Sequence, residues 1–115
     1  MLNQTVIVGR LTKQPELVTM ESGKKVTNMT LAVPRSYKNE NGEYETDFID
    51  CTMWGNVAEK TCEYCNKGDL LGVKGRIQTD TYEVDGKTKK SMQVVVDRVT
   101  FLSNGKSKDQ DKDID

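Results

Sequence analysis

A single segment with helical periodicity interrupts a chain that otherwise alternates with the period of a β-strand. Successive side chains of a strand point to opposite faces, so alternating apolar and polar residues indicate a sheet with one buried face. Between Val26 and Val33, for example, Met29, Leu31 and Val33 share one face. The same pattern predicts further strands over residues 5–11, 48–54, 70–82 and 92–102, with inward faces that include Cys51, Met53, Ile77 and Met92. The chain should therefore be built mainly of β-sheet.

The helical segment falls between the third and fourth predicted strands. Asn56 can cap a helix there, Glu59 follows three residues later as a capping box requires, and Gly68 is the expected stop.

Two further residues indicate where the predicted strands end or bend. Pro34 should end the second strand because proline cannot donate to a ladder, and Gly9 predicts a bulge or bend of the kind that barrels use to close.

Three strands, a helix and two more strands are the element order of an OB fold, an all-β, five-stranded barrel with one helix between strands 3 and 4. An immunoglobulin-like sandwich would need about seven shorter strands and no central helix. With 115 residues the chain is long enough for one domain. We predict an OB-fold domain over residues 1–103, with hairpin turns at residues 39–42 and 85–86, and a disordered polar, acidic tail over residues 104–115.

Charge alone argues weakly against a nucleic-acid partner. Of the 17 basic and 18 acidic residues, three basic and four acidic ones lie from Gly105 onward, which leaves 14 of each. Nucleic-acid-binding domains usually carry a basic excess. The potential in a groove, however, depends on where the charges sit rather than on their sum.

The residue types in the sequence give little support for a catalytic site, a metal site or a cofactor site. The chain has no histidine, which excludes a His-based triad or acid/base scheme. The pair Cys62 and Cys65 could suggest zinc, but a structural zinc site needs four ligands and the chain has three cysteines. Because the pair lies near the predicted helix C-terminus, the helix dipole also disfavours a reactive thiolate. We interpret these cysteines and Cys51 as packing residues, and expect no enzymatic activity, no metal and no cofactor.

The start of the chain lacks the features of a secretory signal, and no apolar run reaches the length needed to cross a bilayer. We expect a protein that stays in the cytoplasm.

Phe48 and Trp54 lie six residues apart on one predicted strand and therefore project from the same face. That face also carries Asp50 and Thr52, so it is not a conventional core face. Outward-facing rings suit stacking against unpaired bases. The pattern leaves a second reading open, in which both rings plug a barrel end or a subunit interface.

Two tyrosines stand among cations. Tyr82 shares strand parity with Lys74 and Arg76, and Tyr37 lies between Arg35 and Lys38. Both are candidates for base stacking beside phosphate contacts. The other aromatic residues give weaker signals: we expect Tyr64 and Phe101 to be packing residues and leave Tyr44 undecided.

Nine basic residues on predicted strands and loops are candidate phosphate contacts, although an exposed charge is commonly only solvated. They are Arg10, Lys13, Arg35, Lys38, Lys74, Arg76, Lys87, Lys89 and Lys90. The lysines at 87–90 are the most specific of these, because they lie in a loop that OB folds commonly use to bind oligonucleotides.

Short motifs follow one another in order along residues 1–103. They are Met1-Leu2-Asn3, residues 6–16, 30–33 and 47–51, Trp54-Gly55, Lys67-Gly68, residues 75–79 and Tyr82. In this order they resemble the bacterial-type single-stranded DNA-binding proteins, in the form found in low-GC Gram-positive bacteria and their phages or plasmids. The resemblance implies sequence-independent binding of single-stranded DNA by a homotetramer of OB folds that protects unpaired strands at the nucleoid during replication, recombination and repair. It places Tyr37, Phe48, Trp54 and Tyr82 on base-stacking positions and makes Arg10, Lys13, Arg35 and Arg76 backbone contacts.

The chain departs from that family pattern in two places. Asp50, Asn56, Asp80 and Thr81 stand where relatives often carry basic or neutral residues. The sequence ends Asp113-Ile114-Asp115, without the usual Gly/Gln-rich linker and the acidic Pro-Phe tip that recruits replication and repair proteins; either this is a short variant or the tail was removed. Two alternatives stay open: an OB module that serves as a protein-interaction scaffold, and an RNA chaperone sensitive to the 2′-hydroxyl.

Overall fold

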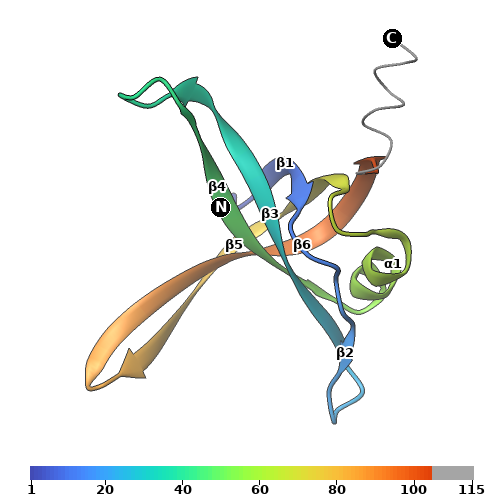
Figure 1. Cartoon of the computed structure of the whole chain (residues 1–115). Coiled ribbons are helices and arrows are strands. Elements are labelled where there is room, and N and C mark those ends of the chain that lie inside the picture. Colours follow the sequence, from blue (N-terminus) through green and yellow to red (C-terminus); the bar gives the residue numbers. More distant parts are fainter. Residues whose placement is uncertain (105–115) are drawn as a thin grey trace.

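The computed structural model describes residues 1–104, which form one closed sheet with a helix at its end (Figure 1). In chain order the elements are β1 (Thr5–Leu11), β2 (Val18–Thr19), β3 (Lys25–Lys38), β4 (Tyr44–Trp54), α1 (Asn56–Tyr64), β5 (Leu70–Val84) and β6 (Lys87–Ser103). The predicted tail lies outside the described residues except for Asn104. None of the helices in the described part is long and apolar enough to cross a membrane.

The sheet closes into a barrel because β1 pairs with two strands. Its order is β1-β5-β6-β4-β3-β2, and β1 also pairs with β3 at Arg10↔Ala32 and Leu11↔Leu31. All pairings are antiparallel except that of β4 with β6, where Cys51 stands opposite Val94. Since β2 contributes two residues only, the barrel has five principal strands, with the helix between the third and fourth of them. The prediction of an OB-type barrel is confirmed.

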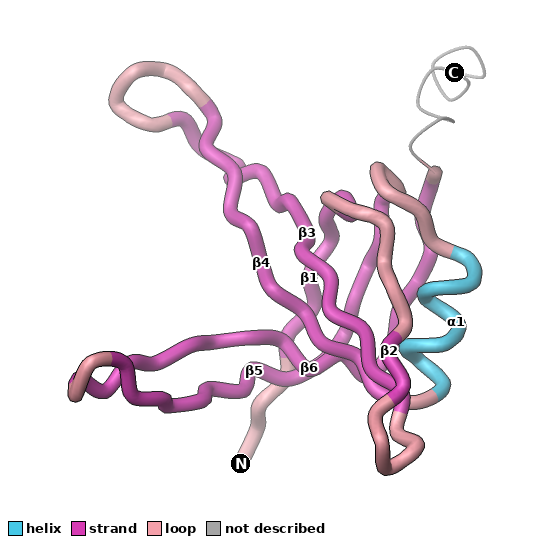
Figure 2. Tube along the Cα trace, turned by 60° about the horizontal axis from the view of Figure 1, so that its bottom comes forward, coloured by secondary structure: helices cyan, strands magenta, loops and turns pink. Residues whose placement is uncertain are grey.

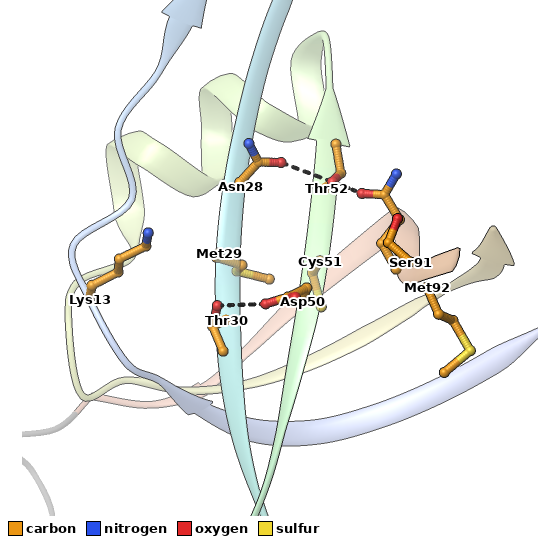
Figure 3. A pocket seen from close by; sticks show the side chains of 10 residues that line it. Lys13, Asn28, Met29, Thr30, Asp50, Cys51, Thr52, Ser91 and Met92 are labelled. Carbon is orange, nitrogen blue, oxygen red and sulfur yellow. Dashed lines mark hydrogen bonds between the residues drawn. The ribbon is translucent and has the colours of Figure 1, made fainter. Parts of the chain in front are cut away.

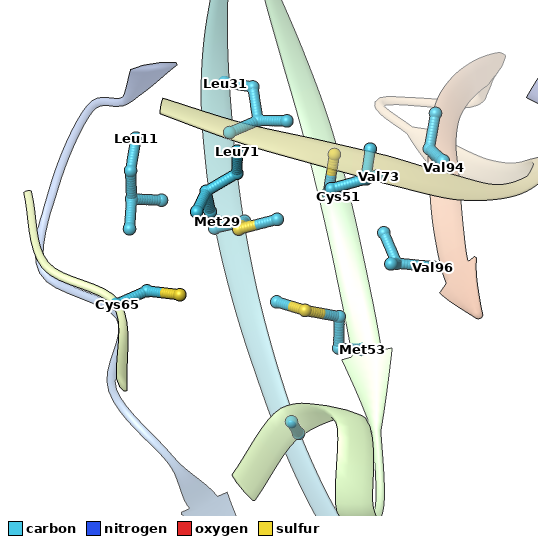
Figure 4. Close-up of a cluster of buried hydrophobic side chains, with 11 residues drawn as sticks. Leu11, Met29, Leu31, Cys51, Met53, Cys65, Leu71, Val73, Val94 and Val96 are labelled. Atoms are coloured by element: carbon cyan, nitrogen blue, oxygen red, sulfur yellow. The ribbon is translucent and has the colours of Figure 1, made fainter. Parts of the chain in front are cut away.

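The core fills the barrel with alternating residues of the five strands (Figure 4). Its fully buried members include Leu11, Met29, Leu31, Cys51, Met53, Leu71 and Val73. The helix α1 contributes Ala58, and Cys65 follows directly after the helix and is also buried. Burial raises the pKa of the Cys51 thiol to about 11, so this cysteine packs as a small apolar residue.

Two glycines let strands approach where a side chain would not fit. A Cβ on Gly9 would lie 2.8 Å from the carbonyl oxygen of Ala32, at the point where β1 passes from one partner strand to the other. A Cβ on Gly75 would collide with the Val95 carbonyl, beside an irregularity in the β5–β6 register. The bend predicted at Gly9 is thus a close backbone contact that closes the barrel.

The strand that was expected to end at Pro34 continues to Lys38, so that prediction is wrong. Beyond Ala32 the only neighbour of β3 is β4, and Pro34 pairs with Thr46 just before a register shift. Proline is tolerated where a strand lacks a second partner to receive its missing N–H. The strands around the 85–86 turn also run further than predicted. The β3–β4 hairpin and the β5–β6 hairpin both extend well away from the barrel (Figure 2).

The predicted cap of the helix is also wrong. Gly55, with a φ of 65°, occupies the N-cap position, and Asn56 is already the first helical residue. Glycine adopts a positive φ at little cost, which lets the chain turn sharply at Gly55 directly after β4. The helix therefore begins one residue earlier than predicted. The side chain of Glu59 forms an ion pair with Lys25 instead of a capping box. The helix ends at Tyr64, before the expected stop at Gly68.

Several residues expected to pack inward are exposed in the single chain. Ile77 and Met92 lie at the base of the β5–β6 hairpin, beyond the region where the barrel interior can cover them. Tyr64 on α1 and Phe101 near the end of β6 are exposed as well. Strand parity does not predict burial once a strand leaves the barrel, because a two-stranded ribbon has no second layer.

Candidate nucleic-acid interface

The four aromatic residues singled out from the sequence are all exposed in the single chain. The exposed fractions are 64% for Tyr37, 66% for Phe48, 44% for Trp54 and 49% for Tyr82. None of them is sealed in the barrel, which leaves their faces open to a ligand or to another protein chain.

Phe48 and Trp54 lie on one face of β4, Phe48 within the strand and Trp54 at its end. Phe48 stands opposite Ala32 of β3, and Trp54 opposite Val26. Six residues of extended strand separate the two rings by about 20 Å. Asp50 and Thr52 lie between them on the same face.

A groove crosses the sheet between these rings, formed by three adjoining pockets. The first, about 400 Å³, is lined by Lys13, Gln14, Glu16, Val18 and Asn28. The second, about 290 Å³, shares Lys13 and Asn28 with it and continues over β4 to β6 (Figure 3). The third, about 180 Å³, shares Asp50, Met92 and Gln93 with the second and reaches Phe48 and Ile77. The groove therefore runs across the strands, from the loop after β1 to the base of the β5–β6 hairpin.

The middle of the groove is a hydrogen-bonded polar network. Thr30 Oγ1 donates to Asp50 Oδ1 at 3.0 Å, which fixes the carboxylate against β3 (Figure 3). Next to it, the hydroxyl of Thr52 contacts the side-chain amides of Asn28 and Gln93. These contacts hold the groove floor rigid and leave polar atoms facing the open side.

Trp54 lines a separate pocket of about 550 Å³ together with the β2–β3 turn and the start of α1. Lys24 and Lys25 both line it, and Lys25 is paired with Glu59. Lys24 is thus a cation beside an exposed ring that the sequence analysis missed. Nothing local in the sequence shows that residues 23–25 fold against Trp54.

The hairpin of β5 and β6 carries Tyr82 among lysines. Tyr82 stands opposite Lys89, and Thr81 opposite Lys90. Asp85 and Gly86 both have positive φ and form the expected two-residue turn. Within residues 1–104 no carboxylate forms an ion pair with Lys87, Lys89 or Lys90. These charges remain available to an anionic ligand.

The hairpin of β3 and β4 holds its cations differently. Arg35 donates to Asp47 from Nε at 3.1 Å and from Nη2 at 2.9 Å, and from Nη1 to Glu45 at 2.6 Å. The hydrogen bond from Arg35 holds the pKa of the Asp47 carboxyl below its usual value. The Lys38 ammonium lies 5.6 Å from the centre of the Tyr44 ring, within cation–π range. The guanidinium of Arg35 is therefore paired with carboxylates of its own hairpin.

The other predicted phosphate contacts fall in different places. Lys13 lines two of the groove pockets. Arg10 donates to the Gly68 carbonyl at 3.0 Å. Lys74 and Arg76 are exposed on β5 but line none of the pockets described above, and Arg76 contacts Asp97 at 3.4 Å. The structure thus brings Lys13 and Phe48 to one groove, places Trp54 beside a separate pocket on the same face of β4, and puts Tyr37 and Tyr82 on separate hairpins.

Comparison with known proteins gives consistent matches over this whole region. The model of the single-strand binding protein family matches residues 2–102. The chain is 48% identical over 103 residues to single-stranded DNA-binding protein B of Bacillus subtilis, a match that covers 89% of this chain and 91% of that protein. It is 44% identical over 115 residues to a single-stranded DNA-binding protein of Staphylococcus aureus, covering 99% and 74%. A third relative, single-stranded DNA-binding protein 2 of Listeria monocytogenes, is 47% identical over 103 residues, covering 89% and 64%.

Proposed function

The chain belongs to the single-strand binding protein family, and from that premise we propose that it binds unpaired DNA without reading its sequence. Bases stack on Tyr37, Phe48, Trp54 and Tyr82, while lysines and arginines around these rings neutralise the phosphates. The protein is a binding protein rather than an enzyme. It covers single strands at the nucleoid during replication, recombination and repair and keeps them from re-annealing.

The observation that supports this function best is the exposure of Phe48 and Trp54 on one face of β4, with Phe48 lining the groove that crosses the same face. Exposed aromatic side chains that lie on one strand face or beside unpaired lysines offer flat surfaces on which bases can stack. Each stacked base contributes about 1–3 kcal/mol, and stacking accepts every base because every base has a π-face. Rings spaced along a groove therefore give affinity without selectivity.

Among the candidate phosphate contacts, we assign the largest role to Lys13 in the groove and to Lys87, Lys89 and Lys90 on the β5–β6 hairpin. Lys38, Lys74, Arg10 and Arg76 are assigned smaller roles because they lie outside the groove or share their charge with other groups. Lys24 joins the set through its place beside Trp54. Arg35 acts indirectly, because its ion pairs with Glu45 and Asp47 stabilise the β3–β4 hairpin that carries Tyr37.

A competition experiment separates this function from the two alternatives. A labelled (dT) oligomer is bound to the protein and displaced by unlabelled single-stranded DNA, duplex DNA or RNA of the same length. Displacement by single-stranded DNA at far lower concentration than by the other two is expected, with an affinity that falls steeply with salt. A protein-interaction scaffold would not bind the labelled oligomer, and an RNA chaperone would release it to RNA at least as readily.

We also propose that the protein assembles as a homotetramer. Val6 and Val8 of β1 and Leu102 of β6 are exposed on the outside of the barrel, where a second chain can cover them. Four chains of 13.0 kDa give a particle of about 52 kDa, which light scattering measures directly. A mass near 13 kDa at micromolar concentration would contradict the tetramer but not the binding function.

A further inference from the structure

We propose that Asp50 makes the middle of the groove select among bases, favouring guanine and disfavouring thymine. The inference rests on the proposed function, because it concerns the DNA that lies between Phe48 and Trp54. It adds a specificity-determining residue to a surface that would otherwise bind by stacking alone.

The position of Asp50 is the first step. It lies on β4 between Phe48 and Trp54, two residues after Phe48, on the face that carries both rings. It also lines both the 290 Å³ pocket and the adjoining pocket beside Phe48. A strand whose bases stack on both rings therefore passes directly over this carboxylate.

The second step concerns the charge of that carboxylate. Asp50 is exposed, and its only hydrogen-bond donor among the described residues is the hydroxyl of Thr30. Within residues 1–104 no lysine or arginine forms an ion pair with it. A phosphate is repelled by a carboxylate that no cation compensates. The DNA backbone must therefore lie away from Asp50, toward Lys13, and a base edge must face the carboxylate instead.

The third step is the complementarity between a carboxylate and the base edges. A carboxylate only accepts hydrogen bonds, and its two oxygens match two parallel N–H donors. Guanine offers such a pair from its ring N1–H and its 2-amino group. Cytosine and adenine each offer one amino group, whereas the single N–H of thymine lies between two carbonyl oxygens that repel the carboxylate. The expected order is guanine, then cytosine and adenine, then thymine.

The pocket also has the dimensions of a site for one base. Its volume of about 290 Å³ lies at the lower end of ligand sites, which run from roughly 300 to 1,000 Å³ for larger molecules. The apolar side chain of Met92 forms one wall and can contact the face of a base whose edge reaches Asp50. Thr52, Asn28 and Gln93 fix the opposite part of the floor through their mutual hydrogen bonds.

The test uses single-base changes in a (dT) oligomer of the shortest length that quenches Trp54. One central thymine is replaced by guanine, by cytosine or by hypoxanthine, which is guanine without its 2-amino group. Each unlabelled oligomer competes with a labelled all-thymine oligomer. The substituted base is therefore never on the labelled strand and cannot alter the fluorescence of the label directly. For the unmodified protein we expect about tenfold tighter binding of the guanine oligomer than of all-thymine, and about threefold weaker binding when the 2-amino group is removed.

Two variants complete the experiment. Asp50→Asn keeps the size of the side chain and its contact with Thr30 but loses the charge and one acceptor oxygen. It should abolish the preference for guanine and raise the affinity for all-thymine DNA. Glu63→Gln removes the same charge from the exposed side of α1, outside the groove, and should keep the preference of the unmodified protein.

Equal binding of all four oligomers by the unmodified protein, or a guanine preference that survives Asp50→Asn, would overturn the inference. Either result leaves the proposed function intact, because single-stranded DNA is still bound. If no oligomer binds at all, the proposed function itself fails.

Discussion

The two long hairpins leave the barrel as arms of similar build, but their charges are used in opposite ways. In the β3–β4 arm, Arg35 is bound by Asp47 and Glu45, and Lys38 lies over the ring of Tyr44. In the β5–β6 arm, Lys87, Lys89 and Lys90 form no ion pair within the described residues. Each arm carries an exposed tyrosine, Tyr37 on the first and Tyr82 on the second.

This difference shows why a count of basic residues is a poor guide to a nucleic-acid surface. An arginine with two carboxylate partners stabilises the geometry of its own arm and adds little positive potential outside it. A lysine without a partner adds its whole charge to the potential that a phosphate meets. We infer that the β3–β4 arm mainly positions a ring and that the β5–β6 arm supplies both a ring and charge.

The largest expected effect comes from removing the rings of the arms. Tyr82→Ala and Tyr37→Ala should each weaken poly-dT binding about 5- to 150-fold, the equivalent of 1–3 kcal/mol for one stacked base. Fluorescence anisotropy measures both. Tyr64→Ala is the matched control, since this tyrosine is as exposed but lies on α1. A loss for Tyr64→Ala as large as for Tyr82→Ala would show that exposure, rather than place, had been mistaken for function.

The salt dependence of binding should separate the arms more sharply. Replacing Lys89 and Lys90 together by alanine should reduce the slope of log K against log salt by about 1.4, or 0.7 for each phosphate released. Arg35→Gln should leave the slope unchanged, because its guanidinium is already neutralised by carboxylates. An equal fall in slope for both variants would mean that the arms contact DNA in the same way.

A smaller effect is expected from breaking the ion pair of the β3–β4 arm. Asp47→Asn removes one of the two carboxylates that bind Arg35, so the arm should open locally and affinity should fall about two- to threefold through the misplaced Tyr37. Hydrogen exchange reports the opening as faster exchange of amides in residues 35–47, with the barrel strands unchanged. Unaltered exchange in that segment would argue that the arm is held by its backbone ladder alone.

The smallest effect concerns pH. The hydrogen bond from Arg35 lowers the pKa of Asp47 in the folded protein, so this contact contributes stability above the unfolded value of about 3.9. The contribution is lost as the pH falls through the lower, folded value. An NMR titration of the Asp47 carboxyl should therefore show a midpoint below about 3.9 that returns toward it in Arg35→Gln. A normal midpoint in the unmodified protein would indicate that the pair does not persist in solution.

Residues whose neighbours are set by strand alternation were well predicted from the sequence. Met29, Leu31, Cys51 and Met53 are buried as expected, and the order of strands and helix gave the barrel. The outward direction of Phe48 and Trp54 followed from the same parity. These features depend on local periodicity, which a single sequence displays directly.

The features that were missed depend on contacts between distant segments. Pro34 could remain in a strand because β3 has no second neighbour there, and Ile77 is exposed because its ribbon has left the barrel. The pairing of Arg35 with Asp47 requires the register of β3 and β4, and the place of Lys24 beside Trp54 requires the fold of the β2–β3 turn. Strand parity and residue type carry no information about such pairings.

Trp54 offers the most direct test of the central claim, because it is the only tryptophan in the chain. Its fluorescence is followed while unlabelled poly-dT is added at low salt, and the titration is repeated as salt is raised. Stacking predicts strong, saturable quenching that is reversed by salt. Fluorescence that stays constant while an independent assay shows the DNA bound would contradict the account, since Trp54 would then lie outside the DNA path.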